Sequence, residues 1–203
     1  MTTEFSQSQA ADIEKNRLAY LRGRKPLFLL PLPGSTQTRL RALKLFAQGR
    51  LEAGLELLDE ANGSGDSFEG TVDGREVQGW RDEDDFLGDI LEVVVADKLH
   101  WLPFVQIESL RLAEQGQLQS LYLPVEIRLI NQEQVSGWLP IRYVQSETHP
   151  EKEIQAAEEV DLYSDEAGCT RCLGLRHWLI GLDAFTPWEF RQLERRSERI
   201  GLM

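Results

Sequence analysis

The 203-residue sequence contains little cysteine, methionine and histidine: two, two and three residues respectively. It has no uninterrupted run of about eighteen apolar residues, the length that a membrane-spanning helix requires. Its first residues, Met-Thr-Thr-Glu-Phe-Ser-Gln, lack the basic flank and the apolar segment of a secretion signal. These absences predict a cytoplasmic protein without a membrane partner.

Catalytic motifs are missing as well. The chain has no glycine-rich phosphate-binding loop and no serine in a nucleophile elbow, so a nucleotide hydrolase or an ordinary hydrolase has no support. The three histidines, His100, His149 and His177, are scattered, and each fits a structural or surface position better than a catalytic base. We therefore expect no enzyme activity and no cofactor.

The charge is acidic and unevenly distributed, with a formal net charge of -12. Residues 1–62 carry 9 basic and 7 acidic side chains, whereas residues 63–203 carry 13 basic and 27 acidic ones. Such a surface repels phosphate backbones, which argues against a nucleic-acid partner. A basic or amphipathic protein segment is a better candidate, and the alternative is that the charge only maintains solubility.

The N-terminal third has helical patterns. The apolar spacing predicts a helix over 8–22, followed by an extended connector over 26–34 that contains three prolines. Ser35 is a candidate N-cap for a helix over 36–48, and a further helix is expected over 51–61. The last two helices form a hairpin with tetratricopeptide-like features, although a single copy does not establish a repeat.

The periodicity becomes strand-like after a turn-rich linker at residues 62–66, where we place the boundary between a helical part (1–62) and a β-rich part (63–203). Three antiparallel hairpins are predicted: 68–72 with 76–80, 90–95 with 99–104, and 125–129 with 135–143. A short acidic helix (150–158), a short strand (160–163) and a last strand pair (173–180 with 185–193) follow. The five tryptophans all fall in or beside these strands, where core packing is the expected role. The fold class is α+β, with a helical hairpin before a mostly antiparallel β-rich domain.

Cys169 and Cys172 form the one recognisable short motif, a C-x-x-C pair that can share a metal or close a redox disulfide. A zinc site needs two further ligands, and a thioredoxin-like site needs a helix after the first cysteine, whereas here a strand is expected. A small metal-binding or thiol-redox protein is therefore the alternative function.

An acidic stretch, Asp82 to Asp85, follows Trp80, and Asp89 lies nearby. Several carboxylates close together can bind a hard cation, but the stretch lacks the glycine and the terminal glutamate of an EF-hand. An acidic turn whose carboxylates accept backbone donors is the better explanation.

An ordered series of short motifs resembles the ImpE family, also called TagJ. The motifs are Leu87-Gly88, Leu91 to Val95, Trp101-Leu102-Pro103-Phe104 and Leu139 to Tyr143. The resemblance extends from about Leu21 to Leu193, and the helical region before it is shorter than is usual in the family. It implies a non-catalytic accessory or adaptor protein of the bacterial type VI secretion system. Its implied partner is the small sheath subunit, whose N-terminal helix would dock in a groove.

The resemblance is densest around the acidic stretch. We therefore predict that Trp80, Asp82, Asp84 and Asp85 contribute to partner binding, because acidic side chains adjoin an aromatic there. The alternative is a turn that its own carboxylates fix in place.

Overall fold

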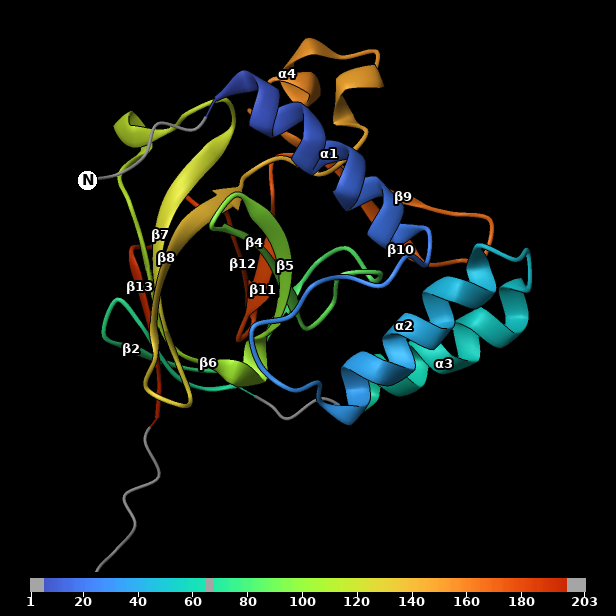
Figure 1. Ribbon diagram of the computed structural model, residues 1–203, viewed down its shortest axis with the longest axis horizontal. Coiled ribbons are helices and arrows are strands. Elements are labelled where there is room, and N and C mark those ends of the chain that lie inside the picture. Colours follow the sequence, from blue (N-terminus) through green and yellow to red (C-terminus); the bar gives the residue numbers. More distant parts are fainter. Residues whose placement is uncertain (1–5, 65–67, 197–203) are drawn as a thin grey trace, which may run out of the picture.

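A computed structural model describes residues 6–64 and 68–196 of the chain, so residues 65 and 66 of the predicted linker lie outside the described residues. The helices are α1 (Gln7–Leu21), α2 (Gly34–Phe46), α3 (Leu51–Gly63) and the single turn α4 (Lys152–Gln155). The first three agree with the predicted ranges. In Figure 1, α2 and α3 lie side by side as a hairpin next to the strands, and α1 lies above this hairpin. No helix of the described part is long and apolar enough to cross a bilayer.

Local capping sets the helix starts. α1 begins at a capping box: the Ser6 hydroxyl accepts from the Gln9 N–H, and the Gln9 side chain accepts from the Ser6 N–H. The prediction of Ser35 as an N-cap is wrong, because Pro33 takes the extended N-cap conformation and α2 begins at Gly34. The Ser35 hydroxyl instead donates to Asp89 Oδ2 at 3.2 Å, which ties the first turn of α2 to the loop around Asp89.

One antiparallel sheet of eight strands forms most of the β-rich part. In spatial order its strands are β2 (Arg75–Gln78), β1 (Glu69–Val72), β13 (Gln192–Arg195), β6 (Ile107–Leu112), β7 (Tyr122–Leu129), β8 (Gln134–Pro140), β4 (Ile90–Val95) and β5 (Lys98–Pro103). The three predicted hairpins are present as β1–β2, β4–β5 and β7–β8. The first turns at Asp73 and Gly74, whose φ angles of 46° and 81° suit a two-residue hairpin turn. Helices together with an antiparallel sheet confirm the α+β class.

Two smaller sheets complete the strands. One contains β12 (Asp183–Phe185), β11 (Trp178–Ile180) and β3 (Trp80–Asp82), and the other pairs β9 (Val160–Ser164) with β10 (Thr170–Gly174). The large sheet curls, and β11 and β12 lie on its inner side (Figure 1), which agrees with the hydrophobic core that they share with it. β9 confirms the short strand predicted at 160–163.

Two predictions for the C-terminal third need correction. The strand pair predicted over 173–180 and 185–193 is reduced to β11 with β12, in which Trp178 is paired with Phe185, because Gly174, with a φ of 83°, ends β10 before it and turns the chain. Residues 192–195 instead join the large sheet between β1 and β6. The helix predicted at 150–158 is reduced to the single turn α4, because Ala157 takes a left-handed φ of 58°.

β4 is buried on both faces and separates two hydrophobic cores. Leu91 and Val93 face the core inside the curled sheet, whereas Ile90 and Val94 face a second core that includes side chains of α1, α2 and α3. This follows from the alternation of side chains along a strand. Of the five tryptophans, three are buried in these cores and two are half-buried, in line with the expected packing role: Trp80, Trp101 and Trp178, then Trp138 and Trp188.

Candidate functional site

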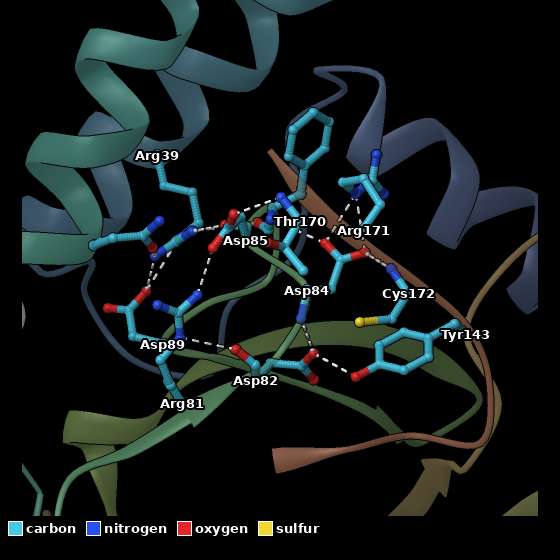
Figure 2. Close-up of polar contacts among 12 residues, drawn as sticks. Arg39, Arg81, Asp82, Asp84, Asp85, Asp89, Tyr143, Thr170, Arg171 and Cys172 are labelled. Atoms are coloured by element: carbon cyan, nitrogen blue, oxygen red, sulfur yellow. Dashed lines mark hydrogen bonds and ion pairs between the residues drawn. The ribbon is translucent and has the colours of Figure 1, made fainter. Parts of the chain in front are cut away.

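The acidic stretch forms a tight turn between β3 and β4 that its own carboxylates hold (Figure 2). Asp82 Oδ1 accepts from the Asp84 N–H at 3.0 Å and from the Tyr143 hydroxyl at 2.7 Å. Asp84 Oδ1 accepts from the Phe86 N–H at 2.9 Å. Asp82 and Asp84 are both buried, so the alternative of a carboxylate-fixed turn describes the local structure.

The same carboxylates bind one edge of β10. The Thr170 N–H donates to Asp85 Oδ2 at 2.7 Å, and the Cys172 N–H donates to Asp84 Oδ2 at 3.1 Å. The next outward N–H along the strand, that of Gly174, donates to the Ser146 hydroxyl at 2.7 Å. Side chains therefore accept from the outward N–H groups of this edge, whereas the carbonyls of Thr170 and Gly174 accept from the backbone N–H groups of Asp85 and Tyr143, and the acidic turn is a structural clamp between β3 and β10.

Of the four residues predicted to contact a partner, three are buried. The Trp80 ring stacks on Phe104 with centroids 3.8 Å apart, and Asp82 and Asp84 are engaged as described above. The Asp85 side chain is 24% exposed and pairs with Arg81, whose side chain is 40% exposed, at 2.6 Å. Partner contact by this surface stays a prediction, and Asp85 is its accessible member.

A buried ionic cluster lies behind the turn. Glu92 Oε2 accepts from Arg17 Nη2 at 2.7 Å and from Arg176 Nη2 at 2.6 Å. Arg176 Nη1 also lies 3.5 Å from Asp82 Oδ2, and all four side chains are at most 1% exposed. Two arginines balance two carboxylates, and through Arg17 the cluster fastens α1 to the sheet.

Burial and the neighbouring arginines shift the pKa values of the Asp82 and Glu92 carboxyl groups in opposite directions. Burial raises the pKa of Asp82 to about 7, although Arg176 lowers it. Burial also acts to raise the pKa of Glu92, but Arg17 and Arg176 outweigh it, so that this pKa is lowered. This cluster was not predicted from the sequence. Its one signal was a glutamate, Glu92, in the middle of an apolar strand.

A second anchor joins α2 to the turn. Arg39 is buried and donates to Asp89 Oδ1 at 3.0 Å, to the Asp85 carbonyl at 2.8 Å and to Asn62 Oδ1 at 2.8 Å. Gly88, at a φ of 50°, lies against this guanidinium, and a Cβ there would overlap it. The glycine of the Leu87-Gly88 motif is thus required by the close approach of Arg39.

The two cysteines are buried and free. Burial raises the pKa of the Cys169 thiol to about 12, and it raises the pKa of the Cys172 thiol as well. A redox cysteine needs a lowered pKa and access to solvent, so these surroundings oppose the thiol-redox alternative. In the described residues, 6–64 and 68–196, no three His, Cys, Asp or Glu side chains are grouped as a metal would require.

Comparisons with known proteins agree with this architecture. A family model described as ImpE protein matches residues 74–194, which include the acidic turn, Glu92 and Arg176. The chain is 31% identical over 144 residues to the type VI secretion system accessory component TagJ of Pseudomonas aeruginosa. That match covers 70% of this chain and 51% of TagJ, so the chain spans about half the length of this curated relative.

A solved structure shows the same fold. The crystal structure of protein VPA1032 from Vibrio parahaemolyticus matches with a TM-score of 0.80 at 21% identity, over 94% of this chain and 71% of that chain. The family model covers more than half of the chain, and the relative named TagJ extends the match. The chain therefore belongs to the ImpE family.

Proposed function

We propose that the chain is a non-catalytic accessory component of a bacterial type VI secretion system and acts in the cytoplasm by binding another component. The observation that carries the proposal is the 31% identity to TagJ, which is named as an accessory component of the type VI secretion system. The buried carboxylates support it, because Asp82, Asp84 and Glu92 are engaged by arginines and backbone donors inside the protein. They hold the fold together rather than facing a substrate-sized cavity.

The proposed partner is the N-terminal helix of the small sheath subunit, bound as a helix in a groove. A hollow of about 800 Å³ lies on the face of the large sheet that α1 also packs against. Trp138, Pro124 and Ala113 give it apolar lining, and charged side chains at its rim include Arg111 and Glu126. The neighbouring α1 already packs as a helix on this face, which supports a second helix there.

The decisive experiment is a calorimetric titration of the purified chain with a peptide of that sheath helix. Saturable one-to-one binding is expected, and a scrambled peptide of the same composition should give no heat. The proposal would be contradicted if neither peptide bound at concentrations up to about 1 mM. A dissociation constant of that size corresponds to only about 4 kcal/mol of binding free energy.

A matched pair of variants tests the groove. Ser136 is exposed and lines the hollow, so Ser136→Arg should obstruct it and weaken binding about tenfold or more. Gln78→Arg adds the same side chain at an exposed position of β2, at the other end of the strand order, and should leave the affinity unchanged. Equal affinities for the two variants would exclude this hollow as the site.

We also propose that Asp85 and its ion-pair partner Arg81, which do not line this hollow, contact the partner outside it. We propose as well that the α2–α3 hairpin has tetratricopeptide-like character and that the chain divides into two parts at residue 62.

A further inference from the structure

β9 (Val160–Ser164) is a strand with an unoccupied edge. The N–H groups of Thr170, Cys172 and Gly174 on β10 point away from β9, toward the side-chain acceptors described above. The residues of β10 that bond to β9 are therefore the alternate ones, Arg171 and Leu173, opposite Tyr163 and Asp161.

It follows from antiparallel geometry that the N–H and C=O groups of Val160, Leu162 and Ser164 point outward. Within residues 6–64 and 68–196 these groups have no hydrogen-bond partner. By contrast, the edge of the large sheet at β5 is covered, because the Trp101 N–H donates to the Leu27 carbonyl at 2.9 Å.

The exposed edge also carries apolar side chains. Leu162 is 44% exposed and Tyr163 is 42% exposed, and consecutive residues of a strand face opposite sides. Proteins usually protect a strand edge with lysine, proline or a covering segment, since an apolar edge pairs with other chains. β9 contains no lysine or proline, and no other segment of the described residues, 6–64 and 68–196, pairs with its outer edge, so it has the properties of an edge that receives another strand.

The charge around β9 indicates which kind of segment can pair with this strand. Residues 158–170 contain five acidic side chains and no basic one: Glu158, Glu159, Asp161, Asp165 and Glu166. The nearest arginine, Arg171, is already held by Asp84 at 2.9 Å and lies over the Phe86 ring. A second copy of this chain would bring the same acidic edge and be repelled, whereas a basic segment would be attracted.

We propose that β9 is a docking edge that binds an extended, basic segment of a partner protein as an added antiparallel strand. Leu162 exchanges both of its backbone hydrogen bonds with one residue of that segment, and Val160 and Ser164 bond to its flanking residues. Leu162 contacts its apolar side chains on one face, and on the other face the carboxylates around β9, Asp161 among them, pair with its lysine or arginine residues. This edge is distinct from the helix groove and does not depend on the sheath-binding proposal.

The probe is a capped peptide of alternating lysine and valine, titrated by fluorescence anisotropy at low and moderate salt. We expect saturable binding that weakens with salt, together with slower hydrogen exchange at residues 160–164 in the complex. Two control peptides separate strand pairing from charge attraction. One carries a methyl group on every backbone nitrogen, so that neither of its edges can donate, and keeps its charge, and the other has glutamate in place of lysine. Equal binding of the methylated peptide would overturn the proposal.

Leu162→Pro is the matching variant of the protein. Proline removes the outward N–H of β9 and blocks a neighbouring strand, while the bonds of Asp161 and Tyr163 to β10 remain. We expect the lysine–valine peptide to bind about tenfold more weakly or worse, in line with loss of main-chain pairing. Gln78→Pro, on the exposed edge strand β2, is the control and should bind normally.

The two docking proposals fail independently. Leu162→Pro should leave titration with the sheath helix peptide unchanged, and Ser136→Arg should leave the lysine–valine peptide unchanged. Normal peptide binding by a folded Leu162→Pro variant would exclude β9 as the docking edge. A dimer of the unmodified chain that Leu162→Pro dissociates would show instead that a second copy occupies it.

Discussion

Asp82 is the single residue whose ionisation should most affect stability. Its folded-state pKa is raised to about 7 by burial, whereas an aspartate in an unfolded chain has a pKa of about 3.9. Between these values the folded state binds the proton and the unfolded state does not. The contribution of Asp82 to stability is therefore fully present below about pH 4 and is lost as the pH rises through about 7.

Asp82→Asn removes this titration. The free energy of unfolding of the unmodified protein should fall relative to that of the variant between pH 5 and pH 8, by an amount on the order of 2 kcal/mol. Urea unfolding of both proteins at several pH values measures the difference, and Asp183→Asn, on exposed β12, controls for a general charge effect. A difference that does not change with pH would contradict the assignment.

Among the four residues predicted to bind a partner, Asp85 is the one that is not buried, so it can be substituted with the least effect on the fold. Asp85→Asn keeps an oxygen that can accept from the Thr170 N–H and removes the negative charge. If Asp85 faces the sheath helix, the affinity of the variant for the sheath helix peptide should fall about two- to fivefold. Most of this change should be a slower association rate, as for other charges at the periphery of an interface. Asp183→Asn is again the control, and unchanged affinity in the Asp85 variant would remove this surface from the interface.

Among the elements, α1 depends most on a single contact. Glu92 accepts from both Arg17 of α1 and Arg176, and neither arginine has access to water. Glu92→Gln would remove the carboxylate that both buried arginines share, leaving Arg17 with Glu14 and Arg176 with Asp82, and should lower the free energy of unfolding by about 3–5 kcal/mol. Glu14, which also pairs with Arg17 but is 28% exposed, supplies the comparison. Glu14→Gln should lower the free energy of unfolding by about 1 kcal/mol or less. Urea unfolding that ranks the two variants in the opposite order would contradict this account.

The elements that could be predicted are those with local signals. The hairpin β1–β2 follows from alternation around Asp73-Gly74, and the continuous burial of β4 matches its apolar run. β13 could not be predicted as a member of the large sheet, because its sequence Gln-Leu-Glu-Arg is mostly polar and its partners, β1 and β6, are distant in the chain. The ionic cluster was hidden for the same reason, since Glu92 lies 75 residues from Arg17 and 84 from Arg176.

For the acidic turn, the sequence predicted the turn itself but not the contacts that each carboxylate makes. Its composition predicted both a carboxylate-fixed turn and a partner surface, and only the neighbours in space distinguish what each carboxylate does. Asp84 is saturated by Arg171 and by the N–H groups of Phe86 and Cys172. Since β10 comes from another part of the chain, no pattern within the turn itself could indicate that its carboxylates accept from the outward N–H groups of that strand.

For the molecule as a whole, the second hydrophobic core determines how the helical and β-rich parts unfold. It combines Ile13 and Tyr20 of α1 and Leu43 and Leu58 of the α2–α3 hairpin with Trp101 of β5. Neither part can lose its structure without exposing the buried surface of the other, so we expect one cooperative transition. Circular dichroism at 222 nm follows the helices, and tryptophan fluorescence follows the β-rich part, because all five tryptophans lie beyond residue 62. The two signals should give the same urea midpoint. Loss of helical signal at a lower urea concentration would instead show that residues 1–62 and 63–203 are separate folding units.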